Sequence, residues 1–118
     1  MSGRNQVVGS FSDSCKNMEL KHGHILRAEC KNAAGHWVTS EIDLNSCIGN
    51  LNGYLSWDYT DFTKSSHEIR LTDNGTKIEA RLTRQDHGTS EPQGIYLNER
   101  IINRDGRLHF VPHNEVGR

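Results

Sequence analysis

Two short turns in the sequence carry most of the side chains that could bind a ligand. Residues 50–53 read Asn-Leu-Asn-Gly and residues 103–106 read Asn-Arg-Asp-Gly, with serines and threonines elsewhere in both halves of the chain. An amide or a carboxylate offers two hydrogen-bonding atoms, so such groups can bind two adjacent hydroxyls of a sugar. The same residue types are favoured in turns for their backbone conformation alone. The residues by themselves leave both explanations open.

Other kinds of chemistry find little support in the sequence. Among seven histidines, the closest pair is His22 and His24, which lies across a predicted turn without cysteines or carboxylates at metal-ligand spacing. No serine has the context of a hydrolase nucleophile, and the carboxylates are too scattered to pick out an acid–base pair. Asn74 fits both an N-glycosylation motif and an ordinary turn. We therefore expect no metal site and no catalytic site.

The segments that must position the two turns are repeated along the chain. Residues 42–57 recur 53 positions later at residues 95–110. The identical pairs are Ile42/Ile95, Leu44/Leu97, Asn45/Asn98, Ile48/Ile101, Asn50/Asn103, Gly53/Gly106 and Leu55/Leu108. Upstream, the matching pairs are Leu26/Ile78, Ala28/Ala80, Cys30/Leu82 and Phe11/Phe62. A fixed period is typical of tandem structures, and each half is too poor in apolar residues to fold alone. We expect two similar halves that share one core.

Many short strands with little helix are predicted. The Asn-Gly and Asp-Gly pairs indicate primed two-residue hairpin turns, and a one-turn helix capped by Asp43 or Asn45 is expected before the first of them. The predicted strands are residues 10–14, 25–31, 36–41, 54–57, 68–71, 77–84, 95–97 and 107–111. Short strands separated by turn signals indicate an all-β domain.

Length and charge exclude several classes of protein. The chain has 118 residues, enough for one domain, and a net charge of -1, which disfavours nucleic acid as a partner. No apolar run approaches the length of a membrane span. Residues 1–9 lack the apolar core of a signal peptide. We therefore expect a cytoplasmic protein, or one that is exported without a leader.

The three cysteines cannot all pair with one another. Cys15 and Cys30 flank a predicted strand-turn-strand whose turn lies near residues 21–23, so they meet if the two strands are in register. Two buried, reduced thiols are the alternative, because cysteine is often buried. Cys47 takes an apolar position whose counterpart is Arg100, and we expect it to be a free, partly buried thiol.

A series of short motifs runs through both halves. It comprises Gly9-Ser10-Phe11-Ser12, Cys15, Cys30, Thr39-Ser40, Ile42-Asp43-Leu44-Asn45-Ser46, Ile48, Asn50, Gly53, Leu55, Trp57, Phe62, Ile95, Leu97, Ile101, Asn103, Asp105-Gly106 and Leu108. In this order and spacing the sequence resembles the cyanovirin-N homologue (CVNH) family of lectins over nearly everything after Val8. The resemblance implies an all-β, cyanovirin-N-like, pseudo-symmetric tandem repeat. Each repeat would form a three-stranded antiparallel sheet plus a β-hairpin, with short helical turns and hairpins exchanged between the halves.

The resemblance also implies a domain organisation and a function. A single domain would cover residues 9–112, with sequence repeats 9–59 and 60–112, between flexible termini at residues 1–8 and 113–118. Family members bind terminal α1-2-linked mannose of high-mannose glycans, with up to one pocket at each end and with neither metal nor cofactor. The alternative is a CVNH-fold protein-interaction module whose sugar pockets have decayed.

Binding residues follow from the resemblance by position. The first-end pocket would comprise Ser10, Asp13, Ser14, Lys31, Ala33, Asn103, Arg104 and Asp105. The second-end pocket would comprise Gly49, Asn50, Asn52, Thr60, Asp61, Lys64, Ser65, Thr83, Arg84 and Gln85. Lys31, Gly49 and Lys64 stand where the founding lectin has acids, and Gly49 is expected to leave a gap. The first-end pocket keeps two carboxylates, so it is expected to bind mannose more tightly.

Two further expectations come from the same resemblance. Cys15 and Cys30 would form a disulfide, whereas Ser66 and Leu82 stand at the places of the second disulfide of the founding lectin. Tyr59 replaces a proline in the hinge between the repeats, which favours a monomer over a dimer that exchanges its halves.

Overall fold

The computed structural model describes residues 10–115, so the terminus predicted to be flexible at residues 1–8 lies outside the described residues, as do residues 116–118. The strands are β1 (Cys15–Lys21), β2 (Ile25–Lys31), β3 (Trp37–Asp43), β4 (Ile48–Leu51), β5 (Tyr54–Trp57), β6 (Ser66–Thr72), β7 (Lys77–Leu82), β8 (Gln93–Tyr96), β9 (Ile101–Arg104) and β10 (Arg107–Phe110). The 3-10 helices are η1 (Phe11–Asp13), η2 (Leu44–Ser46), η3 (Phe62–Ser65), η4 (Leu97–Glu99) and η5 (His113–Glu115). The protein is all-β with short helical turns, as predicted. No helix in residues 10–115 is long and apolar enough to cross a membrane.

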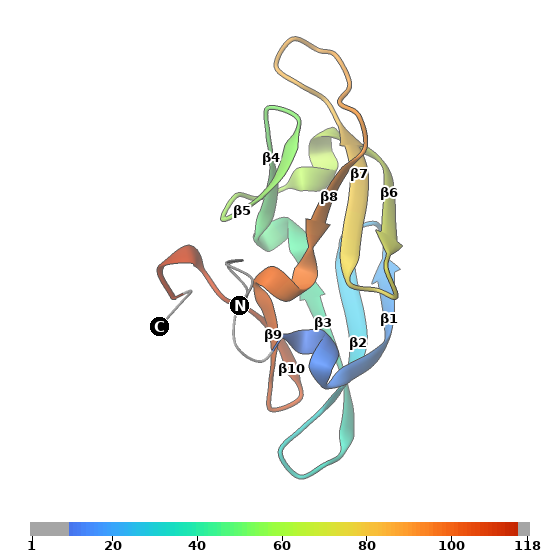
Figure 1. Ribbon diagram of the computed structural model, residues 1–118, viewed down its shortest axis with the longest axis vertical. Coiled ribbons are helices and arrows are strands. Elements are labelled where there is room, and N and C mark those ends of the chain that lie inside the picture. The colour runs from blue at the N-terminus through green and yellow to red at the C-terminus, as the bar shows by residue number, and fades with distance from the viewer. Residues whose placement is uncertain (1–9, 116–118) are drawn as a thin grey trace.

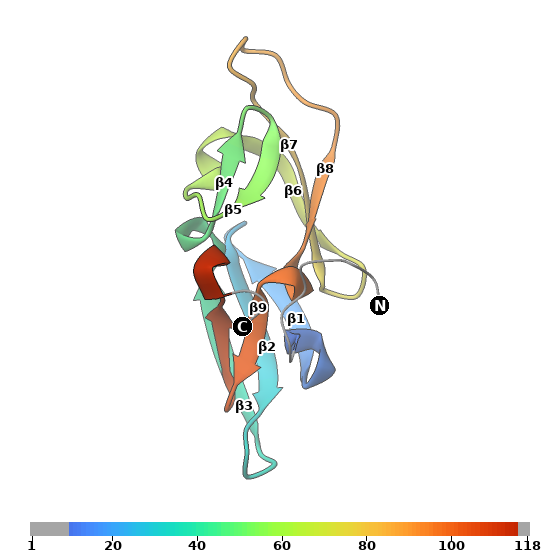
Figure 2. The same cartoon turned by 60° about the vertical axis from the view of Figure 1, so that its left-hand side comes forward.

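The strands form two three-stranded antiparallel sheets and two hairpins. The sheets β1-β2-β3 and β6-β7-β8 follow one another along the long axis of a molecule that measures 50 × 30 × 22 Å (Figure 1). Hairpin β9–β10 packs beside the first sheet, whereas hairpin β4–β5 packs beside the second (Figure 2). Each sheet is thus completed by a hairpin from the other half of the sequence. The predicted exchange of hairpins is confirmed.

One hydrophobic core runs through both halves. The middle strands β2 and β7 bury every second residue, because successive side chains of a strand point to opposite faces. The buried residues on these strands are Leu26, Ala28, Cys30, Ile78, Ala80 and Leu82. Phe11 and Phe62, which match each other in the repeat, are both fully buried in the same core cluster. The expectation of a shared core is confirmed.

Most predicted strands lie within two residues of the observed ones, but residues 10–14 do not form a strand. They form η1 instead, in which Asp13 N–H donates to Ser10 O at 3.0 Å and Ser14 N–H donates to Phe11 O at 3.1 Å. This turn directs Phe11 into the core, which a straight strand at the surface would not do. The strand that pairs with β2 begins only at Cys15.

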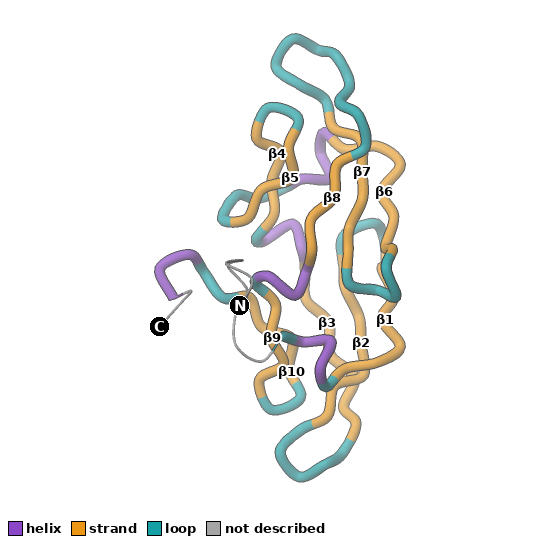
Figure 3. Tube along the Cα trace, in the orientation of Figure 1, coloured by secondary structure: helices purple, strands orange, loops and turns teal. Residues whose placement is uncertain are grey.

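The predicted helical turn before the first hairpin is confirmed as η2. The Asp43 carboxylate accepts from Asn45 N–H at 2.9 Å and so caps the turn. Its counterpart η4 precedes the second hairpin, and both turns lie where a sheet strand leads into a hairpin (Figure 3). Ile48 already belongs to β4, so the turn is shorter than its apolar spacing suggested.

The cysteines pair as predicted, but Cys47 is fully buried and not partly buried as expected. Cys15 lies opposite Cys30 in the register of β1 and β2, and the two form a disulfide. In the second sheet Ser66 lies opposite Leu82, and Leu82 is fully buried as an ordinary core residue. Cys47 is free and fully buried, and burial raises the pKa of its thiol to about 12. Its thiolate is therefore scarce at neutral pH, and the thiol packs as a small apolar side chain.

Candidate functional site

Both Asn-Gly and Asp-Gly turns adopt the predicted primed geometry, with positive φ at both central residues. The φ angles are 47° and 92° at Asn52 and Gly53, and 51° and 87° at Asp105 and Gly106. Each turn joins the two strands of a hairpin, β4 to β5 and β9 to β10. The turns therefore hold two short polar side chains, one at the tip of each hairpin.

Asn50 fastens the first hairpin to the second sheet. Its Nδ2 donates to Ser65 Oγ at 2.7 Å and to Thr83 O at 2.7 Å, while its Oδ1 accepts from Gly53 N–H at 2.7 Å. These three bonds use both hydrogens of the amide and one lone pair of its oxygen. Substituting Asn50 would leave partly buried groups without partners, so the change would disturb folding as well as any binding.

Asn103 makes the equivalent contacts at the other end. Its Nδ2 donates to Ser14 Oγ at 2.8 Å and to Lys31 O at 2.9 Å, and its Oδ1 accepts from Gly106 N–H at 2.8 Å. The repeat thus preserves a hydrogen-bonding unit in which one asparagine joins a hairpin to a sheet. Both asparagines belong to the framework of the candidate pockets.

The tips of the hairpins are held by a second pair of bonds. Asn52 Oδ1 accepts from Gln85 N–H at 3.1 Å, and Asp105 Oδ1 accepts from Ala33 N–H at 2.8 Å. Each bond ties a hairpin tip to the segment that follows the middle strand of the adjacent sheet. One of the two Asp105 carboxylate oxygens is therefore already engaged.

A cavity of about 330 Å³ opens at the second end, between the hairpin β4–β5 and the start of the loop after β7. This second-end cavity is lined by Asn50, Asn52, Ser65, Thr83, Arg84, Gln85 and His87. Six of the ten residues predicted for the second-end pocket are thus brought together around one cavity. All of its side chains are polar.

The other four residues predicted for this pocket form an adjoining patch. Gly49 pairs with Asp61 in a short β-bridge, Asp61 Oδ2 lies 3.7 Å from Lys64 Nζ, and Thr60 Oγ1 donates to the same carboxylate at 3.4 Å. A Cβ added at Gly49 would lie 2.8 Å from both the N and the O of Thr60. The expectation of a gap at Gly49 is wrong, because the backbone of the hinge fills the space.

Arg84 is the main charged group of the second-end cavity. Its Nε lies 3.4 Å from Asp86 Oδ1, which also accepts from Gly88 N–H at 2.8 Å. The Gly88 N–H, followed by the nearby guanidinium, lowers the pKa of the Asp86 carboxyl. The carboxylate is therefore ionised at neutral pH. It orients the guanidinium of Arg84, whose side chain is exposed beside the cavity.

At the first end, the structure brings together Ser14, Lys31, Ala33, Asn103 and Asp105 through the bonds described above. Ser10 lies alongside β9, where it pairs with Ile102 in a β-bridge. Asp13 in η1 and Arg104 in β9 are exposed. All eight residues predicted for the first-end pocket therefore lie on η1, β2 and β9 or directly beside them.

Two residues beside the predicted pockets were not found from the sequence. His87 lines the second-end cavity from a left-handed turn with φ of 68°. Trp37 lies next to the first end. Lys16 Nζ and Lys31 Nζ lie 4.0 Å and 5.0 Å from its ring centroid. Neither residue belongs to a recognisable motif. His87 lies in the same turn as Arg84, where its N–H donates to Arg84 O at 2.9 Å, and Trp37 lies opposite Lys31 in the register of β2 and β3.

His22 and His24 do not belong to a cluster of metal-ligating side chains in the part of the chain that the structure describes. His24 Nδ1 instead lies 2.7 Å from Asp43 Oδ1, at the edge of the first sheet. Among residues 10–115 no group of three or more His, Cys, Asp or Glu side chains could hold a metal ion.

Comparison with known proteins places this architecture in a family. The pattern of the CVNH domain matches residues 11–109. The chain belongs to the CVNH family. A cyanovirin-N homologue of Tuber borchii is 51% identical over 102 residues, which cover 86% of this chain and 98% of the relative. The structure of the T. borchii CVNH protein superposes with a TM-score of 0.77.

Two other solved structures with a similar fold contain sugars. A MoCVNH3 variant in complex with (N-GlcNAc)4 has a TM-score of 0.82 and 27% identity, and the match covers 88% of this chain and 98% of that one. Microvirin in complex with mannobiose has a TM-score of 0.77 and 25% identity, covering 87% and 99%. CVNH proteins are lectins and not enzymes, so the prediction that this chain is no enzyme is confirmed.

Proposed function

We propose that this CVNH protein binds terminal α1-2-linked mannose of high-mannose glycans, and that its main site is the second-end cavity. The observation that carries the proposal is the cavity of about 330 Å³ lined by six residues of the second-end pocket. This volume lies near the lower limit for small-molecule sites, which span about 300–1,000 Å³. It suits a mono- or disaccharide better than a larger ligand.

The chemistry of the lining supports a neutral, polyhydroxylated ligand. Side-chain amides, hydroxyls and a guanidinium supply donors and acceptors, and no carboxylate lines the cavity. The side chains of Gln85 and Arg84 are exposed at its rim and are available to a ligand, whereas Asn50 holds the framework. Binding of mannobiose by microvirin, a relative with the same fold, supports mannose as the sugar.

The number of carboxylates favours the first-end pocket, where Asp13 and Asp105 are retained. One oxygen of Asp105 is already occupied by Ala33 N–H, however, and this lowers its capacity for sugar hydroxyls. We therefore propose the first-end pocket as the weaker of two sites. Two working sites would allow one molecule to gain avidity on a branched glycan.

The test is a titration of wild-type protein with α1-2-mannobiose, followed by calorimetry and by backbone NMR. We expect a Kd in the micromolar to millimolar range, because a small ligand buries few atoms. The double variant Arg84→Ala/Gln85→Ala should raise the Kd of the tighter site about tenfold or more. The matched variant Asp13→Ala/Arg104→Ala at the first end should leave the Kd of the tighter, second-end site unchanged.

The variants avoid Asn50 and Asn103, whose loss would weaken the fold itself. If only the first-end variant abolishes binding, our ranking of the ends is wrong. If wild-type protein binds no mannobiose, the result supports the alternative function as a protein-interaction module. Tighter binding of a GlcNAc tetramer than of mannobiose would keep the sugar-binding function but overturn mannose as the ligand.

We also propose that the protein is a monomer in dilute solution. The hinge between the repeats is held on the molecule by Asp58 N–H, which donates to Cys47 O at 3.0 Å, and by Asp61 N–H, which donates to Asn45 O at 2.8 Å. Exchange of halves between two chains would have to break these bonds, and Tyr59 does not constrain the hinge as a proline would. Light scattering at micromolar concentration should give the mass of one chain. A stable dimer would contradict the proposal.

A further inference from the structure

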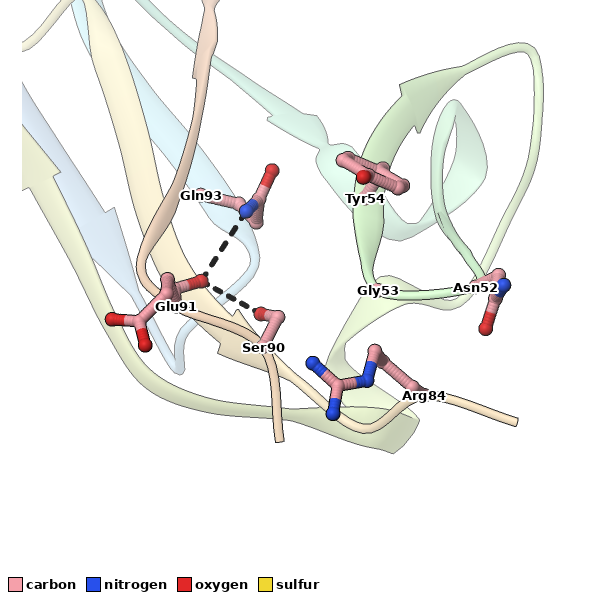
Figure 4. A pocket seen from close by; sticks show the side chains of 7 residues that line it. All are labelled: Asn52, Gly53, Tyr54, Arg84, Ser90, Glu91 and Gln93. Carbon is pink, nitrogen blue, oxygen red and sulfur yellow. Dashed lines mark hydrogen bonds between the residues drawn. The ribbon is translucent and has the colours of Figure 1, made fainter. Parts of the chain in front are cut away.

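A second hollow, of about 280 Å³, lies next to the second-end cavity and contains residues that the pockets described above do not include. It lies between β5 and the segment that leads into β8 (Figure 4). We call it the Tyr54 hollow, after its one aromatic residue. The residues that line it are Asn52, Gly53, Tyr54, Arg84, Ser90, Glu91 and Gln93. Asn52 and Arg84 line both cavities, so the two adjoin each other.

Arg84 forms the boundary between the two cavities, and two glycines make room for it. A Cβ added at Gly53 would lie 2.7 Å from Arg84 Cγ, and one added at Gly88 would lie 2.6 Å from Arg84 Nη2. The side chain therefore lies close against the hairpin turn, with its Nε toward Asp86. Its guanidinium carries several N–H donors, enough to serve a ligand on either side.

The walls of the Tyr54 hollow differ in character. Tyr54 is 62% exposed and stands on one side, whereas Gln93 and Glu91 stand opposite it (Figure 4). Gln93 Nε2 donates to Glu91 O at 3.3 Å, which leaves its amide oxygen and one N–H hydrogen for a ligand. The Glu91 carboxylate points away from Tyr54. An aromatic face opposite an amide matches a sugar ring, which has an apolar face of C–H groups and an edge of hydroxyls.

Charge disfavours an anionic ligand in this hollow. Arg84 is already paired with Asp86, whose Oδ1 lies 3.4 Å from its Nε. This ion pair offsets the positive charge that a phosphate or an acidic side chain would need. A neutral saccharide unit needs only the hydrogen-bond donors of Arg84.

The corresponding position at the first end lacks the aromatic wall. A hollow of about 500 Å³ lies there beside Gly106, and Arg107 takes the place of Tyr54 at the start of the second hairpin strand. Because the pseudo-symmetry relates the two hollows, Arg107 provides a matched control. Of these two hollows, only the Tyr54 hollow has an aromatic residue in its lining.

We propose that the Tyr54 hollow is a second saccharide subsite, which extends the second-end cavity across Arg84 and binds the units that follow the terminal mannose. The inference rests on the proposed mannose-binding function of that cavity. Each cavity alone has room for a short piece of an oligosaccharide, whereas the two together suit a longer linear chain. The protein would thus prefer extended α1-2-linked arms over short ones.

The experiment compares α1-2-mannobiose with a linear α1-2-linked mannotetraose on the full chain, by calorimetry. The tetraose should bind wild-type protein more tightly than the disaccharide. Tyr54→Ala should weaken the tetraose about three- to tenfold, as expected for one aromatic contact, and change the disaccharide less than twofold. Tyr54→Phe should restore most of the tetraose affinity, and Arg107→Ala at the first end should leave it unchanged. Gln93→Ala should act in the same direction as Tyr54→Ala.

The outcomes separate the two proposals. If the disaccharide binds but the tetraose binds no better, or if Tyr54→Ala leaves the tetraose unaffected, the subsite is overturned and the mannose site stands. If Tyr54→Ala weakens both ligands equally, Tyr54 belongs to the terminal-mannose site and the extension is wrong. If wild-type protein binds neither ligand, the proposed function itself fails. Because Tyr54 is an exposed residue, its loss should leave the fold intact, which a thermal melt checks.

Discussion

Removing the Cys15–Cys30 disulfide is expected to lower the free energy of unfolding by about 3 kcal/mol, the chain-entropy value for a loop of about fifteen residues. The bridge joins β1 to β2 at a sequence separation of 15, and both cysteines are buried. Without the bridge, the unfolded chain gains conformational freedom that the folded state does not share. For a domain of this size, the loss corresponds to a fall in Tm of roughly 10–15 °C.

Thermal and chemical denaturation of Cys15→Ala/Cys30→Ala measure this effect. Wild-type protein denatured in reductant should show most of the same loss, because reduction opens the bridge without changing any side-chain carbon. Cys47→Ala serves as the matched control, since it removes a buried thiol that closes no loop. A count of three free thiols in denatured, unreduced protein would contradict the prediction.

Asp58→Asn is expected to destabilise the protein by about 2–3 kcal/mol, because it leaves a buried positive charge without its partner. Arg100 is only 7% exposed. Its Nη2 donates to Asp58 Oδ2 at 2.5 Å and its Nη1 donates to Val111 O at 2.9 Å. Breaking a fully buried pair costs about 3–5 kcal/mol, and a third of the Asp58 side chain remains exposed, which reduces the cost.

Asparagine is the informative replacement because Asp58 has a left-handed backbone with φ of 70°, which asparagine tolerates as well as aspartate. The matched control is Asp61→Asn in the same hinge, also at positive φ, with 63°. Among residues 10–115, the one ion-pair partner of Asp61 is the exposed Lys64 at 3.7 Å, so its substitution should cost less than about 1 kcal/mol. An equal loss of stability in the two variants would show that the contact between Asp58 and Arg100 does not stabilise the protein.

The same ion pair makes stability depend on pH. Partial burial alone would raise the pKa of the Asp58 carboxyl, but Arg100 and the N–H of His113 outweigh burial and lower it. A carboxyl with a lowered folded-state pKa stabilises the protein above its unfolded pKa, near 4, and loses that contribution as the pH falls through the folded value. The difference in stability between wild type and Asp58→Asn should therefore shrink below about pH 4. Denaturation series at several pH values would measure this.

Local features of the sequence predicted the elements of the fold, because each depends on neighbouring residues. The positive φ of Asn52 and Gly53 follows from the residue types, and the burial of Leu26 and Ala28 follows from strand periodicity. The exchange of hairpins and the choice of pocket residues came from the family resemblance instead. Residues 10–14 were misjudged because five alternating residues do not distinguish a strand from a 3-10 turn, which long-range burial of Phe11 decides.

Tertiary structure alone decided how the candidate site is built. Asn50 is bonded to residues 15 and 33 positions away, and this brings β4 to the cavity that the turn at Arg84 also lines. The hinge backbone fills the space beside Gly49. Arg84 lies between two cavities because Gly53 and Gly88 have no side chain. Such contacts join segments that are distant in the chain. Their geometry depends on packing across both halves, which no local pattern of residues records.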